Sequence, residues 1–318
     1  ALPSARQRRP VRQRLSHEPA LQPLALRHAR PLGYRRRLAP ADPELMKFVE
    51  FGGDGPPVHF AHANGYPPGS YRRLLTPLTA RYRVEAICFR PLWQPFDQRS
   101  DISGWRLLAK DLIAHIEQRC DAPVRGIGHS MGGVATLFAA VERPDLFDSI
   151  VLLDPVFLPL KYVLALRMTP ARHQRRLPLI RKAQDRPHVW PDRQAAFDFH
   201  RRARAFSRLP DEALWDYIEA GTRETADGVE LAFSGAWEAQ VYGTVPHVWR
   251  KLARCRVPMM GLRGSESTTC DPAAWRRWHR LQPRATFVEI PRSGHLVPME
   301  RPAATAAAVS EFLAGRAN

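Results

Sequence analysis

Long apolar runs, paired cysteines and lysines are all scarce in this sequence. Although 44% of its 318 residues are hydrophobic, no apolar stretch reaches the length of about 18 residues that indicates a membrane-spanning helix. We therefore expect no membrane span. The four cysteines are scattered and none has C-x-x-C spacing, which favours free thiols in a reducing compartment. The sequence thus predicts a cytoplasmic protein.

Only five of the 48 basic residues are lysine, and the formal net charge is +17. Clustered arginine would favour nucleic-acid binding, but the excess is spread along the chain, so we expect no specific nucleic-acid partner. Residues 1–45 carry ten arginines and three acidic residues, and they lack the apolar core of a secretory signal. We interpret them as a basic, disordered arm. Two other interpretations explain the composition of these residues as well. They are an organellar targeting peptide, and a natural start at Met46 with the upstream residues extraneous to the protein.

The strongest local signal is the G-x-S-x-G motif Gly128-His129-Ser130-Met131-Gly132. A short apolar strand precedes it, and small residues typical of a packed helix follow. A serine at such a tight strand-to-helix turn is held above the sheet, and the flanking glycines let strand and helix approach closely. The next N–H group, that of Met131, lies at a helix N-terminus, where negative charge is favoured. Ser130 is therefore the candidate nucleophile.

Strands and helices alternate on both sides of this motif. The first two expected strands, around Phe48–Phe51 and Val58–Ala61, flank a glycine-rich turn and predict a hairpin. Apolar periodicity predicts helices and strands beyond it, and this alternation implies a parallel sheet with helices on both faces. The further segments are helices at 71–82, 105–116, 134–141, 272–281 and 303–313, and strands at 84–89, 149–153, 259–262 and 286–290.

Residues 156–255 interrupt this alternation. Helical stretches near 192–206 and 211–220 are evident, no buried strand is clear, and aromatic residues are frequent. We interpret the segment as a helical cap laid over the edge of the sheet, with most of its aromatic side chains packing the cap's own core. The predicted division is therefore the arm (1–45), the core (46–155 and 256–318) and the cap (156–255).

A serine hydroxyl needs a nearby base and a carboxylate that orients the base. Of the twelve histidines, only His295 follows a strand in a Ser-Gly-His setting near the C-terminus. No histidine has the spacing of a zinc motif, so we predict neither a metal nor a cofactor. The loop His62-Ala63-Asn64-Gly65 follows a strand, and its backbone N–H groups suit an oxyanion site.

Together these residues resemble the α/β-hydrolase superfamily over roughly residues 46–316. The resemblance rests on Gly128–Gly133, on the ending Gly294-His295-x-x-Pro298-x-Glu300-x-Pro302, and on His62–Gly65. It implies an α/β fold with a mostly parallel, twisted sheet of about eight strands, helices on both faces and a helical cap inserted after the sixth strand. It also implies the chain order serine, acid, histidine, with Asn64 and Met131 supplying the oxyanion N–H groups.

The sequence departs from the family pattern at two places. Arg90-Pro91-Leu92-Trp93 replaces Arg-Gly-x-Gly, which should reshape the rim of the pocket. The usual acid position is Ser267. Two carboxylates remain as candidates: Glu266 on the same loop, and Asp154 at the end of the sixth strand. We favour Asp154, because a carboxylate fixed at a strand end before proline is better ordered, and keep Glu266 as the alternative.

The predicted function is that of a serine hydrolase, with a Ser-His-Asp/Glu triad, that cleaves a carboxylic ester of a small or medium-sized molecule through an acyl-enzyme. Hydrolysis of a carbon–carbon bond, a thioester or a lactone uses the same groups and stays open. A non-catalytic binding protein of the same fold is the alternative from another class. The sequence gives neither the substrate's acyl and alcohol groups nor the oligomeric state.

Overall fold

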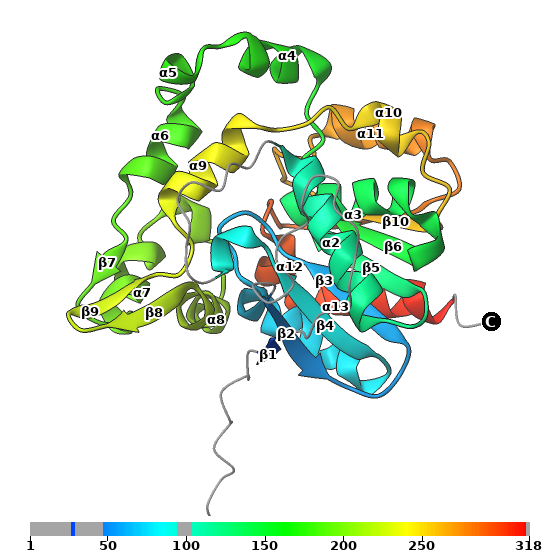
Figure 1. Cartoon of the computed structure of the whole chain (residues 1–318), viewed down its shortest axis with the longest axis horizontal. Coiled ribbons are helices and arrows are strands. Elements are labelled where there is room, and N and C mark those ends of the chain that lie inside the picture. Colours follow the sequence, from blue (N-terminus) through cyan, green and yellow to red (C-terminus); the bar gives the residue numbers. More distant parts are fainter. Residues whose placement is uncertain (1–26, 29–46, 94–103, 316–318) are drawn as a thin grey trace, which may run out of the picture.

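The computed structural model describes residues 27–28, 47–93 and 104–315. Apart from Arg27–His28, the predicted arm lies outside the described residues. The core is a twisted sheet of eight described strands with helices on both faces (Figure 1). In chain order the strands are β1 (Arg27–His28), β2 (Lys47–Gly52), β3 (Pro57–Ala61), β4 (Arg83–Cys88), β5 (Val124–His129), β6 (Phe147–Leu153), β10 (Met259–Gly264) and β11 (Thr286–Ile290).

The spatial order of the strands is β1-β2-β4-β3-β5-β6-β10-β11. All neighbours from β4 to β11 are parallel, whereas β1 and β2 join antiparallel at one edge. This confirms the predicted fold. The expected hairpin is wrong, because β2 and β3 both pair with β4 and not with each other. Strand β3 is buried on both faces, because Phe60 and Ala61, which point to opposite faces, are both at 0% exposure, so it lies inside the sheet.

Alternate side chains of the strands pack into two separate hydrophobic cores, one on each face of the sheet. Ile150 and Leu152 of β6 pack with α2 (Trp105–Arg119), α3 (Met131–Glu142) and α11 (Pro272–Leu281) on one face. Val151 and Leu153 point the other way, into the core formed with α1 (Arg72–Leu75) and α13 (Pro302–Ala314). This period-two alternation follows from strand geometry. The sheet is therefore covered on both faces, as a parallel sheet requires.

The expected helix at 71–82 is divided into three short pieces. These are the 3₁₀ helices η2 (Pro68–Tyr71) and η3 (Thr76–Ala80), with α1 between them. Pro77 has no N–H to donate and its ring crowds the preceding turn, so an α-helix cannot run through it. The remaining short helices outside the cap segment are η4 (Arg90–Leu92), η5 (Pro144–Leu146) and α12 (Val297–Glu300).

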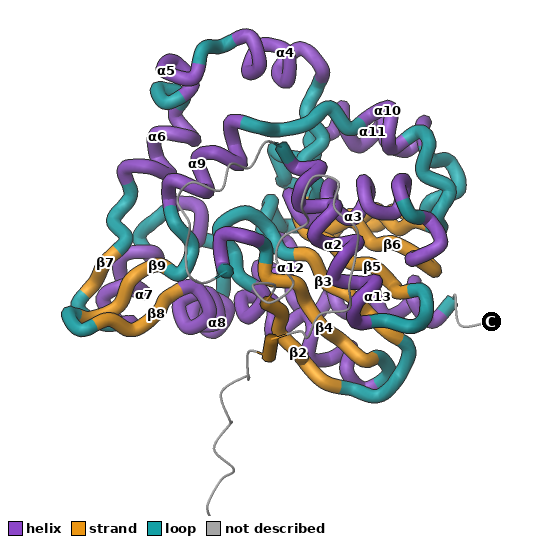
Figure 2. Tube along the Cα trace, in the orientation of Figure 1, coloured by secondary structure: helices purple, strands orange, loops and turns teal. Residues whose placement is uncertain are grey.

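The cap segment, defined as residues 156–255, contains strands as well as helices. Its helices are α4 (Leu160–Met168), α5 (Ala171–Gln174), α6 (Pro178–Asp185), α7 (Arg193–Arg201), η6 (Arg204–Phe206), α8 (Asp211–Gly221), α9 (Gly235–Gly243) and α10 (Trp249–Leu252). Between them, β7 (Val189–Trp190), β8 (Thr222–Thr225) and β9 (Gly228–Leu231) form a separate antiparallel sheet, visible beside α7 and α8 in Figure 2. Strands of two to four residues are too short to give a period-two signal, which is why none was expected.

No helix among the described residues combines the length and the apolar character needed to cross a bilayer. The four cysteines, all within this part of the chain, carry free thiols. The domain boundaries inferred from the sequence stay a prediction.

Candidate active site

Ser130 is the single residue between the end of β5 and the start of α3. Its backbone has φ 55° and ψ −115°, a strained conformation that is rare for a residue with a side chain. A Cβ atom at position 132 would lie 2.1 Å from the carbonyl oxygen of Ala61, so only glycine permits this approach of helix to strand. The local sequence thus forces the tight turn that carries the hydroxyl group.

Three side chains from distant parts of the chain meet above this turn. The Oγ atom of Ser130 is 2.9 Å from Nε2 of His295, and Nδ1 of His295 is 3.1 Å from Oδ1 of Asp154. Asp154 directly follows β6, the neighbour of β5, and Ser130 N–H donates to the carbonyl of Leu153. Parallel strand ends therefore bring the serine and the carboxylate side by side, and the loop after β11 adds the histidine.

Asp154 is completely buried, and both of its carboxylate oxygens have further donors. Oδ1 accepts a hydrogen bond of 2.7 Å from the hydroxyl of Ser267, and Oδ2 accepts one of 3.0 Å from the N–H of Gly264. The alternative acid, Glu266, is 46% exposed and pairs with Arg208 at the surface. The structure therefore brings Asp154, and not Glu266, to His295. The sequence showed Ser267 only as a missing acid and gave no sign of its contact.

The loop that carries His295 is held from both sides by Glu300. This buried carboxylate accepts hydrogen bonds from the N–H groups of Gly294, at 2.7 Å, and Leu296, at 3.2 Å. Those two residues flank His295, so the contacts fix the backbone on each side of the imidazole. Glu300 was part of the sequence motif, but its role there was unassigned.

Besides the contacts among Ser130, His295 and Asp154, a second chain of hydrogen bonds reaches the backbone of His295. The N–H of Ala63 donates to the hydroxyl of Tyr71, which lies 2.8 Å from Nδ1 of His129, and Nε2 of His129 lies 2.9 Å from the carbonyl oxygen of His295. These contacts are satisfied when Tyr71 donates to Nδ1 and Nε2–H donates to the carbonyl. Burial, with the charge of nearby His295, lowers the pKa of His129 well below its usual value. Neutral His129 thus couples the loop after β3 to the His295 loop, a role that its place in the motif did not reveal.

The two predicted oxyanion donors lie at the ends of β3 and β5. Met131 is the first residue of α3, and Asn64 lies in the loop after β3. Among the described residues, neither backbone N–H has a protein acceptor. The side chain of Asn64 is turned away to donate to the carbonyl of Glu238 in α9, at 3.1 Å. The oxyanion role of the two residues stays a prediction.

His62 fixes the start of the same loop. Its Nδ1 atom lies 2.7 Å from the carbonyl oxygen of Ala63, and its Nε2 atom accepts from the N–H of Phe89 at 3.0 Å. Burial lowers the pKa of His62 to about 4, so the ring is neutral near pH 7. The loop is thereby tied to the residue that follows β4.

One cluster within the described chain has the residue types of a metal site. His59 on β3, Glu85 on β4 and His115 on α2 are buried, and their ligand atoms lie within 4.8 Å of one another. The carboxylate of Glu85 also contacts the guanidinium groups of Arg119, at 3.3 Å, and Arg83, at 3.8 Å. These cations compensate the buried charge without an ion. The sequence missed the cluster because its members are 26 and 30 positions apart.

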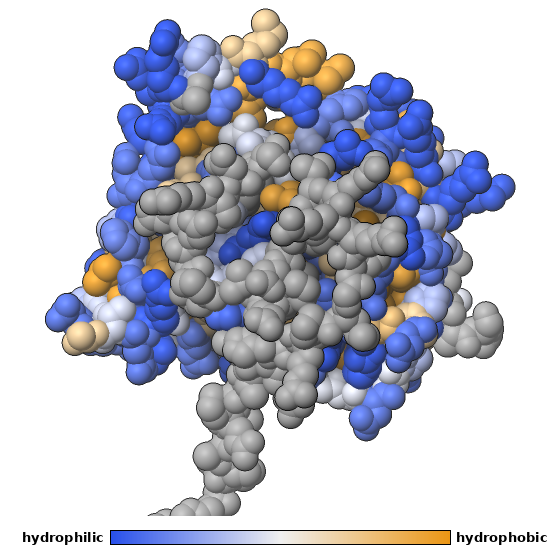
Figure 3. All heavy atoms as spheres, in the orientation of Figure 1, coloured by the Kyte–Doolittle hydropathy of each residue, from blue (hydrophilic) through white to orange (hydrophobic). Residues whose placement is uncertain are grey.

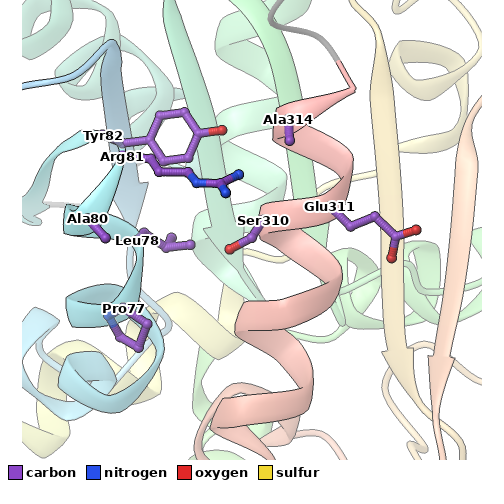
Figure 4. A pocket seen from close by; sticks show the side chains of 8 residues that line it. All are labelled: Pro77, Leu78, Ala80, Arg81, Tyr82, Ser310, Glu311 and Ala314. Atoms are coloured by element: carbon purple, nitrogen blue, oxygen red, sulfur yellow. The ribbon is translucent and has the colours of Figure 1, made fainter.

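A surface hollow of about 280 Å³ lies between η3 and α13. Figure 4 shows the side chains of Arg81 and Tyr82 extending toward α13, which carries Ser310 and Ala314. These residues precede β4 or belong to the closing helix, so the hollow is at the N-terminal ends of the strands. Ser130 follows the C-terminal end of β5, at the opposite edge, where ligands bind in open α/β sheets. The hollow is therefore separate from the candidate site.

Comparison with known proteins places this chain among hydrolases. The sequence model of the alpha/beta hydrolase family matches residues 60–308. The chain is 27% identical to the sn-1-specific diacylglycerol lipase ABHD11 of Mus musculus over 221 residues, which cover 67% of this chain and 66% of that protein. It is 25% identical to the 2-(acetamidomethylene)succinate hydrolase of Mesorhizobium japonicum over 270 residues, which cover 82% and 89% of the two chains.

Solved structures agree with the family match. The crystal structure of E-2-(acetamidomethylene)succinate hydrolase superposes with a TM-score of 0.72 at 22% identity, covering 84% of this chain and 94% of that one. A thioesterase domain from the curacin biosynthetic pathway gives 0.67 at 20% identity, with 84% and 94% covered. At this identity the likeness concerns the fold. Since the family match spans most of the sequence, the chain belongs to the alpha/beta hydrolase family.

Proposed function

We propose that this hydrolase is a serine enzyme that cleaves a carboxylic ester of a small or medium-sized molecule. The observation that carries the proposal is the continuous hydrogen-bond chain from Ser130 Oγ through His295 to Asp154. A hydroxyl, an imidazole and a carboxylate in this order form the arrangement that activates serine for acyl transfer. Residues 156–255 act in this proposal as a cap over the site, supported by the contact between Asn64 and Glu238.

In the proposed mechanism Ser130 attacks the ester carbonyl while His295 takes the hydroxyl proton. His295 then gives that proton to the leaving alcohol, and a water molecule activated by the same imidazole cleaves the acyl-enzyme. Asp154 fixes the tautomer of His295 and stabilises the imidazolium form. The N–H groups of Asn64 and Met131 stabilise the negative charge on the carbonyl oxygen.

We favour an ester over other substrate bonds because one relative is named as a lipase. The mouse relative is a diacylglycerol lipase. Another curated relative is named a 2-(acetamidomethylene)succinate hydrolase, so carbon–carbon, thioester and lactone substrates remain alternatives for the same residues. A binding protein without catalysis is the alternative of another kind.

A fluorophosphonate probe tests the nucleophile directly. We expect the native chain to form a covalent adduct, Ser130→Ala to form none, and His295→Ala to react far more slowly. Ser310→Ala is the matched control, because Ser310 lies by the hollow at the opposite edge of the sheet. Absence of labelling in the native chain would leave the binding protein as the better proposal. Turnover of nitrophenyl esters, thioesters and lactones then identifies the bond.

A further inference from the structure

The cap segment exposes large apolar side chains that the fold does not use. Seven large hydrophobic residues are exposed among the described residues, and six of them belong to one short stretch of the cap. We call these six the cap patch: Leu160, Tyr162, Leu164, Met168, Leu177 and Leu179. Tyr162 is 57% exposed and Met168 is 81% exposed. Large apolar side chains exposed together in one stretch of a chain in this way point to an interaction site.

Helix α4 has two apolar faces, and only one of them packs against the protein. Val163 is buried, and Leu166 packs against the main core. Leu160, Leu164 and Met168 are spaced four residues apart and therefore form a stripe on a different face of the helix. A surface helix ordinarily directs polar residues to water. The apolar stripe therefore indicates that this face of α4 binds an apolar surface outside the chain.

Positively charged side chains accompany the patch in the sequence. The stretch from Pro155 to Gln184 contains no aspartate or glutamate. Its exposed cations are Lys161, Arg167, Arg172, Arg175, Arg176, Arg181 and Lys182, and none of them forms a salt bridge within the described part of the chain. Figure 3 shows the hydrophobic surface over α4 bordered by hydrophilic side chains. The surface therefore combines exposed apolar groups with cations that form no salt bridge among the described residues.

We propose that the cap patch docks this enzyme onto an anionic phospholipid bilayer, with the apolar side chains in the interface and the cations on the lipid headgroups. Helices α4 and α5 stand at the outer end of the cap, far from the sheet (Figure 1), so the patch protrudes and reaches a flat surface. Interfacial helices combine the same two features, apolar insertion and attraction of Lys and Arg to anionic lipid. A second copy of this chain is a poor occupant, because two cationic patches repel each other.

Sedimentation with vesicles tests the proposal on the full chain. The vesicles contain phosphatidylcholine alone or an equal mixture of phosphatidylcholine and phosphatidylglycerol. We expect binding to the anionic vesicles only, weakening as salt is added. Leu164→Ser with Met168→Ser should weaken binding by at least about tenfold, since each change removes an exposed apolar group that the bilayer would bury. Val189→Ser, which changes the remaining large hydrophobic residue exposed in the described part of the chain, should leave binding unchanged.

Charge is tested in the same assay. Arg175→Gln with Arg176→Gln should weaken binding by about fivefold for each charge removed, whereas Arg256→Gln with Arg284→Gln, two exposed arginines outside the patch, should have little effect. Residues 1–45 are the same in all variants, so differences between variants report the patch and not the basic arm.

Four results would overturn the proposal. They are no binding to either vesicle, equal and salt-independent binding to both, patch variants that bind like the native chain, and a dimer in light scattering that Leu164→Ser with Met168→Ser converts to monomer. The last result would identify a second copy as the occupant. Ser130→Ala should bind vesicles like the native chain, so failure of docking and failure of the proposed catalysis are separate outcomes.

Discussion

The hydroxyl of Ser267 donates a hydrogen bond to the same Asp154 oxygen, Oδ1, that lies within hydrogen-bond distance of His295. Position 267 is where the family resemblance implies the acid of the site. In this chain the carboxylate that contacts His295 comes from the end of β6 instead, and the hydroxyl of Ser267, in the loop after the neighbouring strand β10, donates a hydrogen bond to it. In the proposed mechanism Ser267 is therefore a positioning residue for Asp154.

Ser267→Ala should lower kcat while leaving KM almost unchanged. Hydrogen bonds to a charged group contribute about 1.5–3 kcal/mol, and we expect a part of this to appear as a kcat loss of roughly tenfold. Steady-state kinetics on the best ester measures it. Ser265→Ala is the matched control, because Ser265 lies in the same loop but accepts from Arg292 N–H. Equal losses in the two variants would mean that the loop, and not the Asp154 contact, matters.

Exchanging each candidate carboxylate for its amide tests the acid assignment. Asp154→Asn should lower kcat by roughly a thousandfold or more, because the amide no longer holds the productive tautomer of the imidazole. Glu266→Gln should retain nearly full activity, since its carboxylate pairs with Arg208 at the surface. Both variants are compared by turnover and by circular dichroism, which checks that they are folded. Modest and similar losses in both would contradict the assignment of Asp154.

Tyr71→Phe should disturb the site without touching Ser130 or His295. The change leaves the N–H of Ala63 and Nδ1 of His129 without a partner, and an unsatisfied buried group costs about 1–3 kcal/mol. We expect lower stability together with a kcat loss of roughly three- to tenfold, because the chain of contacts ends at the His295 carbonyl. Tyr82→Phe, also buried but near the opposite edge, should change activity very little. Unchanged kcat in Tyr71→Phe would show that the second hydrogen-bond chain is structural only.

The buried cluster around Glu85 predicts loss of stability in acid. Burial alone would raise the pKa of Glu85, but contacts with His115, His59 and Arg119 outweigh it and lower the pKa from 4.5 to about 2. An acid whose pKa is lower in the folded state stabilises it above the unfolded value, and this contribution is lost as pH falls toward 2. Burial, assisted by the charge of His115, lowers the pKa of His59 to about 3. As pH falls below about 6.5, His59 therefore becomes protonated in the unfolded chain while it stays neutral in the folded chain. This difference also destabilises the fold in acid.

Urea unfolding measures this effect. The stability lost by Glu85→Gln relative to the native chain should be on the order of 3 kcal/mol near neutral pH, and it should shrink steadily as pH approaches about 3. Glu311→Gln, an exposed change on α13, should show no such trend. A difference between native chain and Glu85→Gln that does not vary with pH would exclude the ionised carboxylate as its cause.

The parts of the fold that the sequence predicted depend on local signals. The strand–serine–helix turn at Ser130, the strand before Asp154 and the loop around His295 are each encoded within a few residues, and the structure joins these three side chains by hydrogen bonds. Their catalytic roles remain proposals. The fold was predictable because alternating strands and helices permit few other arrangements, and the observed sheet and the family match confirm it.

The features that the sequence did not predict depend on distant contacts or very short elements. Strand β4 inserts between β2 and β3, and no local pattern distinguishes this from a hairpin. The cap strands have two to four residues. The contact between Ser267 and Asp154 spans 113 positions, and that between Tyr71 and His129 spans 58. Each residue alone has an ordinary identity, so only its partner in space reveals its role.

The register between β5 and β6 already sets Ser130 beside Asp154, whereas His295 arrives from a loop 165 positions after the serine. During synthesis Ser130 and Asp154, the proposed nucleophile and acid, are therefore made long before His295, the proposed base. In the proposed mechanism, a nascent or truncated polypeptide without β11 and the following loop lacks the base that activates the serine. The proposed acyl transfer therefore requires that the last strand has joined the sheet, and turnover would report completed folding.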